Sequence, residues 1–503
     1  MATSRKVLSC LSPAAETANA VPVQPATLSD RGELPLAVDL DGTLIKTDLL
    51  WESLLSVLKQ NPVSILLIPF WLLRGKAYLK HQLTDRAQVD VSLLPLHQEF
   101  LTFLQEEHRR GRNLVLVTAA DRKWAERVAR QVGLFSEVMA SDGKLNLKGQ
   151  NKSDLLRQRF GKGGFAYAGN EASDTAVWIQ AGAAFLVNAP GRLVDRTRKF
   201  VPVERVFDDR RNPVWVFLNA VRAKQWVKNL LVFVPLLTSH HLGDLLPLLA
   251  CALAFLAFSS VASSVYVVND LCDLHNDRCH PSKKARAFAA GDLSIKSGIL
   301  LIPLLLLAAV GVSLFLPAEF LLVLGAYYVL NLGYSLYLKQ VMILDVLMLA
   351  VFYAMRISAG GVAGGIPISH WLLIFSVFIF LSLASGKRVS ELHALRRENH
   401  QNSVGRGYLS GDLEQLASQG TASGYIAVLV LSLYIYSPEV TVLYESPQLL
   451  WLICPLLLYW ISRFWLWVHR GQVQEDPIVF VMRDRVSFLV GLLTLLVMLF
   501  AKG

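Results

Sequence analysis

The sequence predicts two folds in one chain: an N-terminal α/β domain on a parallel sheet, then an all-α membrane bundle of about nine transmembrane helices. Of the 503 residues, 53% are hydrophobic and the mean hydropathy is +0.42, which is too apolar for a wholly soluble protein. The apolarity is uneven. Residues 1–215 have a mixed composition, whereas residues 226–501 are mostly long apolar runs separated by short polar loops. One soluble and one embedded domain are therefore expected.

The composition divides the chain into four parts. Residues 1–33 are rich in Ala, Ser, Pro and Thr without periodicity, which predicts a disordered leader. An α/β domain is expected over 34–205, a linker with an interfacial entry over 206–228, and the transmembrane domain over 229–503. The net charge of +10 is typical of basic loops in a multi-pass membrane protein, so no nucleic-acid partner is predicted. Five cysteines form no disulfide framework.

Three predicted strands of the N-terminal domain end in polar residues. The apolar run 34–38 suits a central parallel strand and leads into Asp39 and Asp41. The second run, 114–117, leads into Thr118, and the third, 165–168, leads into residues 169–174. Ligands bind at the carboxyl ends of strands in open α/β sheets, so these polar residues are expected to form one site.

With Lys152, which opens a helical segment, these motifs resemble the haloacid dehalogenase-like (HAD) phosphohydrolases over about residues 34–200. The resemblance implies that Asp39 is the nucleophile and Asp41 the general acid/base. It implies that Thr118 and Lys152 hold the phosphoryl group. The implied magnesium site consists of Asp39, Asp41, Asn170 and Asp174. The family often has Asp at position 170, so Asn170 implies weaker metal binding. A degenerate domain kept as a scaffold stays open as an alternative.

The same resemblance implies a cap over about 48–110, inserted after the first strand. Within it, residues 63–73 are apolar and are followed by Arg74, Lys76 and Lys80. Eleven residues are too few to span a bilayer. Two interpretations stay open: the segment lies at the membrane interface, or it packs as the core of the cap.

Nine spans are expected in the second half of the chain. The first is weak, and the set is 228–243, 245–268, 299–316, 320–338, 341–360, 370–386, 423–437, 448–468 and 486–501. Loops after even-numbered spans carry Lys and Arg, whereas the loops near 239–244, 317–319, 361–369 and 438–447 carry none. This asymmetry predicts a multi-pass protein of the cell inner (plasma) membrane with a cytoplasmic N-terminal domain.

An acidic motif follows the second span. Asn269, Asp270, Asp273 and Asp277 stand where the helix would reach water, and a continuing helix would place the three Asp side chains on one face. Clustered carboxylates beside Lys283 and Arg286 favour magnesium with a bound diphosphate. A solvated helix cap is the alternative. Zinc held by Cys272, His275, Cys279 and His280 is disfavoured, because the spacing is tighter than in structural zinc sites.

With an entry segment that carries Arg222, Gln225 and Lys228, this motif resembles the UbiA superfamily of membrane prenyltransferases over about 215–501. The resemblance implies a helical bundle around a lipid-facing cavity, with Mg²⁺-diphosphate bound by acidic motifs that include Asp270, Asp273 and Asp277.

Further charged residues are expected to line this cavity. Asp345 and Arg356 share a face of the fifth span, and charges inside a membrane usually pair or line a cavity. Lys339 precedes them. A structural pair bridged through neighbours is the alternative.

The second acidic motif of the superfamily is altered. Lys387, Arg388 and Glu391 stand where two Asp are typical, and a surface salt bridge is the alternative. This pattern resembles the decaprenyl-phosphate phosphoribosyltransferase branch. The resemblance implies 5-phosphoribose transfer from phosphoribosyl diphosphate to a polyprenyl phosphate, for arabinan precursor synthesis in the cell wall. The fused domain could then dephosphorylate the product.

Two other functions stay open. One is an aromatic prenyltransferase of the 4-hydroxybenzoate type that uses prenyl diphosphate, against which the missing Asp pair argues. The other is a transporter with a soluble regulatory domain, for which no convincing internal repeat is found. No oligomeric state is predicted.

Overall fold

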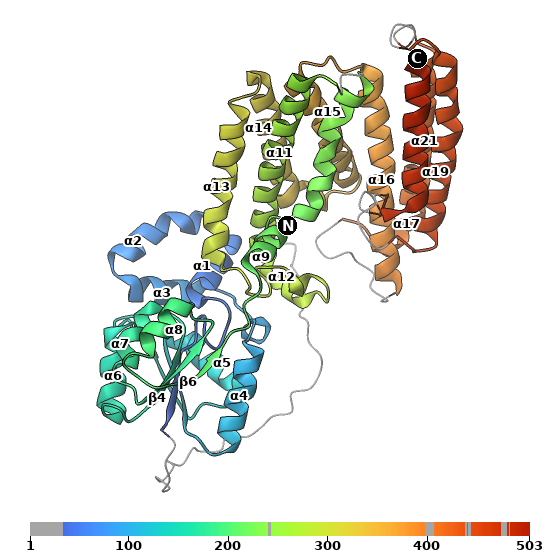
Figure 1. Ribbon diagram of the computed structural model, residues 1–503. Helices are drawn as coiled ribbons and strands as arrows, with labels where there is room; N and C mark the ends of the chain where they lie inside the picture. Colours follow the sequence, from blue (N-terminus) through green and yellow to red (C-terminus); the bar gives the residue numbers. More distant parts are fainter. Residues whose placement is uncertain are drawn as a thin grey trace. The chain divides into compact units, whose positions relative to one another are not determined.

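The computed structural model describes residues 34–239, 243–397, 407–437, 440, 444–473, 480–481 and 483–502 (Figure 1). The leader predicted over 1–33 lies outside these residues. The chain forms two compact units. The first, here the mixed unit, joins the residues up to Ala220 with Asp270–Ile299. The second, here the helical unit, joins Val221–Asn269 with the chain from Leu300 onward.

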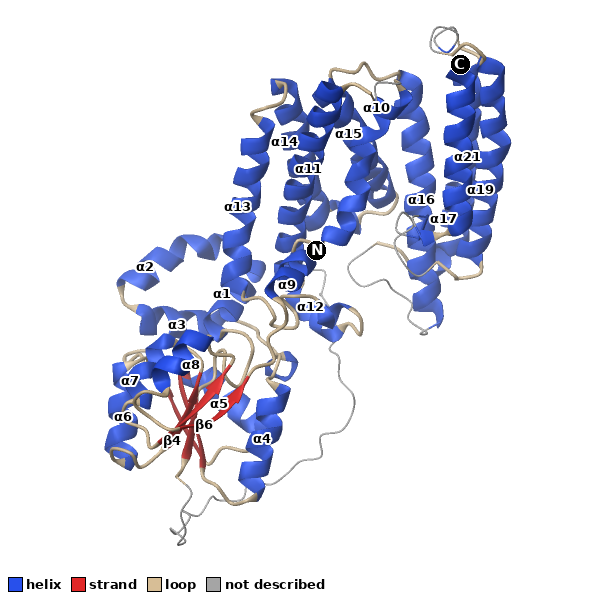
Figure 2. Cartoon of the chain, in the orientation of Figure 1, coloured by secondary structure: helices blue, strands red, loops and turns tan. Residues whose placement is uncertain are grey.

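The mixed unit is built on a six-stranded sheet in which every pair of neighbouring strands is parallel (Figure 2). The strand order is β3-β2-β1-β4-β5-β6. The strands are β1 (Leu36–Val38), β2 (Leu114–Asp121), β3 (Glu137–Ser141), β4 (Ala166–Gly169), β5 (Ala183–Val187) and β6 (Val203–Phe207). The three strands expected from the sequence are confirmed, and β1 is central as its uninterrupted apolar run predicts.

Side-chain alternation along β1 supplies both faces of the sheet. Leu36 and Val38 belong to a core that also contains residues of α4 (Gln98–Arg109) and α5 (Arg122–Val132). Ala37 belongs to a second core with residues of α6 (Gln150–Phe160), α7 (Thr175–Trp178) and α8 (Gly191–Thr197). Helices on both faces leave the carboxyl ends of the strands free for a site.

The segment between β1 and β2 carries most of the expected cap. Asp48 accepts a hydrogen bond from the backbone N–H of Leu50 and so caps α1 (Leu49–Gln60). The segment η1 (Pro62–Leu67) and the helices α2 (Ile68–Leu73) and α3 (Lys76–Arg86) follow. After β6, α9 (Pro213–Ala220) ends this part of the mixed unit.

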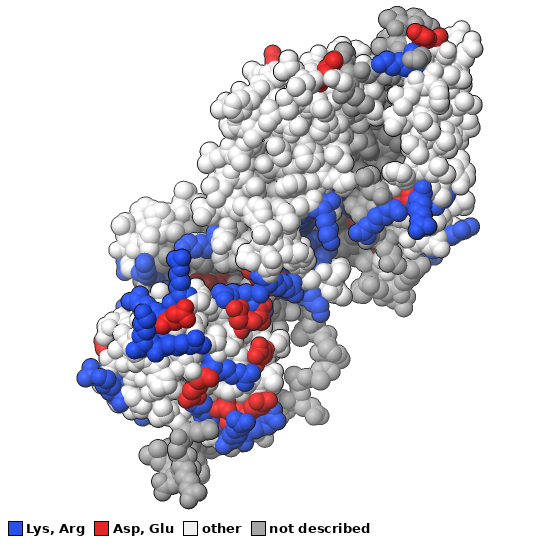
Figure 3. Space-filling model, in the orientation of Figure 1, with Lys and Arg blue, Asp and Glu red and all other residues white. Residues whose placement is uncertain are grey.

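Long apolar helices make up most of the rest of the chain. They are α11 (Leu245–Cys272), α13 (Ile295–Ser313), α14 (Ala318–Leu336), α15 (Leu344–Gly364), α16 (His370–Arg397), α17 (Leu413–Ile435), α19 (Ile453–His469) and α21 (Arg485–Lys502). Among the described residues, eight helices are long and apolar enough to cross a membrane. Charged side chains are sparse over most of the visible face of this bundle (Figure 3).

The weak first span expected over 228–243 does not form a long helix. Residues Ala223–Phe233 form the 3₁₀ segment η4, and Val234–Thr238 form the short helix α10. Two features explain the difference. Asn229 is buried and bonded by its side chain to Ser259, and Gly360 of α15 approaches the carbonyl of Val232 so closely that a Cβ would clash at 1.9 Å. The described part of the segment, up to residue 239, therefore packs against α15 as two short elements.

Candidate active sites

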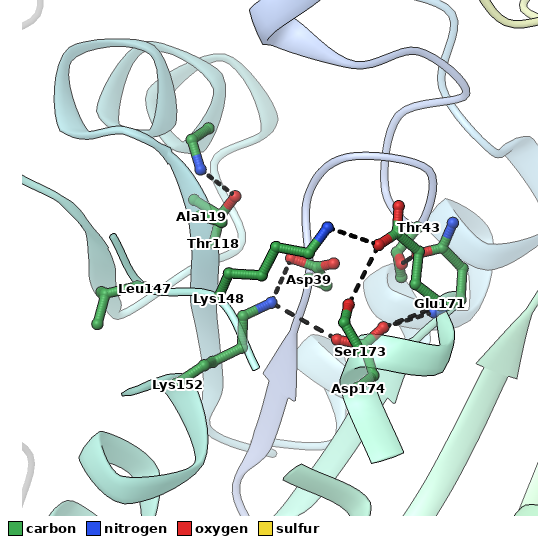
Figure 4. Close-up of polar contacts among 12 residues, drawn as sticks. Asp39, Thr43, Thr118, Ala119, Leu147, Lys148, Lys152, Glu171, Ser173 and Asp174 are labelled. Carbon is green, nitrogen blue, oxygen red and sulfur yellow. Dashed lines mark hydrogen bonds and ion pairs between the residues drawn. The ribbon is translucent and has the colours of Figure 1, made fainter. Parts of the chain in front are cut away.

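The first candidate site lies at the carboxyl end of β1 in the mixed unit. The Lys152 amino group donates to Oδ1 of Asp39 at 2.8 Å and lies 3.8 Å from Oδ1 of Asp174 (Figure 4). Lys152 is 2% exposed and Asp39 8% exposed, so this ion pair is largely shielded from water. A buried lysine beside a carboxylate that follows a central strand is the arrangement that phosphoryl transfer through an aspartate requires.

Burial also changes the charge balance at this site. Loss of water raises the pKa of Asp39 to about 6, and the nearby Lys152 ammonium opposes the rise. The pKa of Asp41 is also raised well above its usual value, first by burial and then by the neighbouring Asp48 carboxylate. The positive charge of Lys152 alone therefore does not compensate the negative charges of Asp39 and Asp41, and a bound divalent cation would neutralise the remainder.

The other residues implied by the resemblance occupy the same strand ends. Thr118 is fully buried within β2, where its hydroxyl accepts the backbone N–H of Ala120 at 3.0 Å. Oδ1 of Asp41 accepts the backbone N–H of Leu49 at 3.0 Å, and the hydroxyl of Thr43 donates to the side-chain Oδ1 of Asn170 at 3.3 Å. The three strand ends thus bring the predicted residues together.

Asp174 is held by the protein through both carboxylate oxygens. Oδ1 accepts the hydroxyl of Tyr167 at 2.8 Å, and Oδ2 accepts the backbone N–H groups of Asn170 and Glu171. Tyr167 also accepts the Lys152 amino group at 2.8 Å. The sequence analysis missed Tyr167, because a tyrosine inside an apolar strand run is indistinguishable from a packing residue.

Two further lysines near this site were also not singled out for it. Lys148 pairs with Glu171 at 2.8 Å, as Figure 4 shows, and Lys80 of the cap donates to the carbonyl of Ala119 at 2.6 Å. Burial lowers the pKa of Lys80, and the carboxylates of Asp41 and Asp48 oppose the shift. The strand ends are therefore lined by cations as well as carboxylates, which suits a phosphate ester.

The second candidate site is the acidic motif after α11, also in the mixed unit. The Arg286 guanidinium donates to Oδ1 of Asp270 at 3.0 Å and to Oδ2 of Asp277 at 2.6 Å. Both carboxylates are only 3% exposed. Burial raises the pKa of Asp277, while Arg286 lowers it. Arg286 therefore bridges two buried acids, a pair of carboxylates that suits a divalent cation.

The acidic motif does not continue as one helix. Residue Asp273 has φ −97° and ψ 12° and is the N-cap of a new helix, α12 (Leu274–Cys279). The expectation that helical offsets would align all three Asp is therefore wrong. Asp270 and Asp277 still converge, because Arg286 bridges them, whereas Asp273 is partly exposed at the break. Lys283, on the short 3₁₀ turn that follows, is exposed.

A buried ion pair joins α12 to the cap. The Arg278 guanidinium donates to both carboxylate oxygens of Glu52 in α1, at 2.6 and 3.2 Å, and both side chains are at most 7% exposed. The hydroxyl of Thr47 donates to the same carboxylate at 2.7 Å. Because Arg278 follows Asp277 directly, this pair connects the acidic motif to the helix that follows the Asp39 loop.

The helical unit holds a third polar cluster inside its spans. Arg388 of α16 donates to both oxygens of Asp345 in α15, to Glu391 at 2.7 Å and to the hydroxyl of Tyr334 at 3.1 Å. The Tyr334 hydroxyl donates to Asp345 at 2.7 Å. Asp345 has no exposed surface. Arg356, which was predicted to share a helix face with Asp345, does not bond to it.

Arg356 belongs to a separate cluster with the entry segment. Its guanidinium donates to the side-chain Oδ1 of Asn229 at 2.8 Å, to the Tyr327 hydroxyl at 2.7 Å and to the backbone carbonyl of Phe352 at 2.6 Å. Tyr327 and Tyr334 had not been selected from the sequence, because a tyrosine inside an apolar run is indistinguishable from a packing residue.

The remaining predicted residues lie on the entry segment and near helix ends. Lys228 is 8% exposed, and the Arg222 guanidinium stacks over the Tyr266 ring at 5.0 Å. The half-exposed members of the set are Arg222, Gln225, Asn269, Lys339 and Lys387.

The metal-ligand chemistry fits magnesium better than zinc. Within the described part of the chain, no group of three or more His, Cys, Asp and Glu side chains stands ready to hold a metal. A zinc site built of Cys and His would need such a group. Magnesium needs only one or two carboxylates, because water and substrate phosphate supply its other ligands. Asp270 with Asp277, and Asp39 with Asp41, provide such pairs.

Comparisons with known proteins assign both parts of the chain. The model of the UbiA prenyltransferase family matches residues 230–490, and that of the haloacid dehalogenase-like hydrolases matches residues 36–177. The chain belongs to the UbiA prenyltransferase family and carries an N-terminal HAD-like domain. It is a multi-pass integral membrane protein.

Individual relatives extend this result. The uncharacterized protein y4nM of Sinorhizobium fredii is 37% identical over 92% of this chain and 90% of its own length. The nodulation protein NoeC of Azorhizobium caulinodans is 38% identical over 54% of this chain and 88% of its own length. A decaprenyl-phosphate phosphoribosyltransferase of Mycolicibacterium smegmatis is 37% identical over 37% of this chain and 60% of its own length.

Among solved structures, a UbiA homologue from Archaeoglobus fulgidus bound to DMAPP and Mg²⁺ matches with a TM-score of 0.45 and 15% identity. The match covers 57% of this chain and 98% of that one.

Proposed function

We propose that the membrane domain transfers 5-phosphoribose from phosphoribosyl diphosphate to a polyprenyl phosphate. We further propose that the HAD-like domain removes the 5-phosphate from the product. The reactions would lie on the cytoplasmic side, which the Lys- and Arg-rich loops favour.

The observation that carries this proposal is the Arg388 network. A prenyl diphosphate bound through two or more magnesium ions calls for a second set of free carboxylates. Here Asp345 is neutralised by Arg388, and Glu391 bonds the same guanidinium. One acidic motif, which contains Asp270 and Asp277, and a second motif that carries cations suit a donor with a further phosphate besides its diphosphate. The 37% identity to a decaprenyl-phosphate phosphoribosyltransferase supports the same donor.

The transfer forms one bond and breaks one. An oxygen of the lipid phosphate attacks the anomeric carbon of ribose, and the bond from that carbon to the diphosphate oxygen breaks. Asp270 and Asp277 would hold Mg²⁺, which when bound neutralises charge on the leaving diphosphate. Arg286 lies against both carboxylates and would bind an oxygen of the leaving diphosphate.

The hydrolysis would use Asp39 as the nucleophile toward the 5-phosphate. Asp41 would protonate the departing sugar oxygen and then take a proton from the water that releases phosphate. Lys152 holds Asp39 in place at 2.8 Å and would bind a phosphoryl oxygen.

Single variants of the full-length protein in detergent separate the two reactions. With phosphoribosyl diphosphate and polyprenyl phosphate, the wild type should accumulate polyprenyl-phosphoryl ribose, and Asp39→Asn should accumulate its 5-phosphate, as mass spectrometry would show. Asp277→Asn should form neither, yet still hydrolyse p-nitrophenyl phosphate. Turnover of prenyl diphosphate with an aromatic acid in place of these substrates would refute the sugar donor. Identical products from wild type and Asp39→Asn would refute the phosphatase step.

A further inference from the structure

The cap of the HAD-like domain displays an apolar surface. Seven side chains between Val63 and Leu73 are 44–86% exposed; they are Val63, Ile65, Leu66, Leu67, Phe70, Leu72 and Leu73. In Figure 3 the region over α2 is uncharged, with Lys and Arg side chains beside it. Apolar surfaces of this size on a soluble domain mark contact with a partner or a membrane.

The fold of the cap holds this surface outward. Trp71 is 8% exposed and belongs to the core of the domain, and the Arg86 guanidinium stacks over its ring at 4.8 Å. Ser64 is likewise buried. Trp71 and Ser64 therefore anchor the segment, whereas its seven exposed apolar side chains are not part of the core of the cap. The sequence left two interpretations open for residues 63–73. The exposure of these seven side chains excludes the one in which they form the core of the cap.

The same helix that leads into this segment touches the end of a membrane span. The Lys59 amino group, in the last turn of α1, donates to the carbonyl of Cys272 at 2.9 Å. Cys272 is the last residue of α11, one of the helices able to cross a membrane. Residue Pro62, where the apolar segment starts, follows Lys59 by three positions. Glu52 of α1 fixes the contact further through Arg278.

The charges around the segment have one sign. No acidic residue occurs between Glu52 and Asp85, whereas Lys59, Arg74 and Lys76 are exposed at its two ends. Apolar side chains flanked by cations are the composition of segments that lie in the interface of an anionic bilayer.

We propose that residues 62–73 lie in the lipid interface, in the leaflet where α11 ends. The contact between Lys59 and Cys272 favours a bilayer as the partner that covers the apolar side chains. It does so because α11, a helix able to span a membrane, ends beside the start of the segment. The proposal rests on the membership of the UbiA family and does not depend on the substrates proposed above. It makes the HAD-like domain an interface-bound module whose substrates can stay in the membrane.

Quenching by brominated lipids tests this placement. In full-length protein with its five cysteines replaced by serine, an environment-sensitive thiol fluorophore is attached to Leu72→Cys. Ile179→Cys is the matched control, because Ile179 is also 49% exposed but lies in the loop before β5, beside Gly163 at the opposite end of the sheet from the cap. Both proteins are reconstituted in vesicles of phosphatidylcholine and phosphatidylglycerol, with or without bromine on the acyl chains.

The fluorescence at position 72 should fall by about half in brominated vesicles, and that at position 179 should not change. Leu73→Cys, at the most exposed side chain of the segment, should repeat the result. Equal quenching at 72 and 179 would overturn the proposal. So would a label at 72 that is shielded from aqueous iodide yet insensitive to brominated lipid, since a protein partner or a second copy would then cover the surface.

Discussion

At the scale of single residues, Tyr167 shows how one neutral hydroxyl can orient two charged groups. It accepts from Lys152 and donates to Asp174, each at 2.8 Å, in a place with no exposed surface. Asp174 in turn holds the backbone of the 170–171 turn. The position of Lys152 beside Asp39 therefore depends on a strand residue outside the predicted motifs.

Replacement of Tyr167 by Phe should weaken this arrangement without removing any residue of the motifs. We expect phosphatase turnover on p-nitrophenyl phosphate to fall about 10-fold, because a lost buried hydrogen bond costs about 1–3 kcal/mol. Ribosyl transfer should be unchanged. Tyr78→Phe is the matched control, since that hydroxyl bonds Arg74 at an exposed position. A full phosphatase rate in Tyr167→Phe would show that Lys152 is positioned without it.

At the scale of elements, Arg388 joins α16 to α15 and α14. Its bonds reach Asp345 in α15 and Tyr334 in α14, and its own side chain is 2% exposed. The interior of a membrane bundle offers no water to replace these partners. The network is thus a candidate substrate contact, and it also links three helices of the bundle.

Arg388→Met should destabilise the bundle, because the buried carboxylate of Asp345 would lose its cationic partner. The expected cost is about 3–5 kcal/mol, seen as a lower thermal unfolding temperature in detergent. Adding Asp345→Leu to Arg388→Met should restore much of the stability while transfer remains low. If the double variant were no more stable than the single one, the ion pair would not be the cause of the loss.

The pair between Glu52 and Arg278 joins α12, which carries Asp277, to α1, which follows the Asp39 loop. Glu52→Gln should lower the ribosyl transfer rate, because α12 would lose the contact that fixes Asp277. The charge-reversed pair Glu52→Arg with Arg278→Glu should recover part of that rate. Arg205→Gln, which removes an exposed pair with Glu99, is the control and should have no effect. Wild-type transfer in Glu52→Gln would show that α12 is positioned by other contacts.

At the scale of the whole molecule, both proposed reactions depend on a divalent cation. Removal of magnesium with EDTA should abolish ribosyl transfer and phosphate release, and added Mg²⁺ should restore both. Asn170 supplies no charge, so the HAD-like domain should need a higher Mg²⁺ concentration than the transferase. Asn170→Asp should lower the concentration required for phosphate release alone. Activity that persists in EDTA would contradict the role assigned to the carboxylate pairs.

Local patterns in the sequence predicted the elements, but not the contacts between them. The apolar run before Asp39 predicted β1, and long apolar runs predicted the eight long helices. The expected span at 228–243 was wrong because the buried bonds of Asn229 outweigh apolarity there. The helix break at Asp273 was missed because the residues around it carry no Gly or Pro. Partners such as Tyr334, Asp345 and Arg388 meet only after folding, so spacing could not pair them.

The contact between α1 and residues 270–299 also has a consequence for biosynthesis. Residues 34–220 leave the ribosome before α11 and contain the whole sheet with its two cores, so they can fold before α11 is made. When residues 273–294 emerge, Glu52 and Lys59 are already in place to capture Arg278 and the end of α11. The folded domain would then hold this loop on its own side of the bilayer while the later helices insert, so that it guides topology before it catalyses anything.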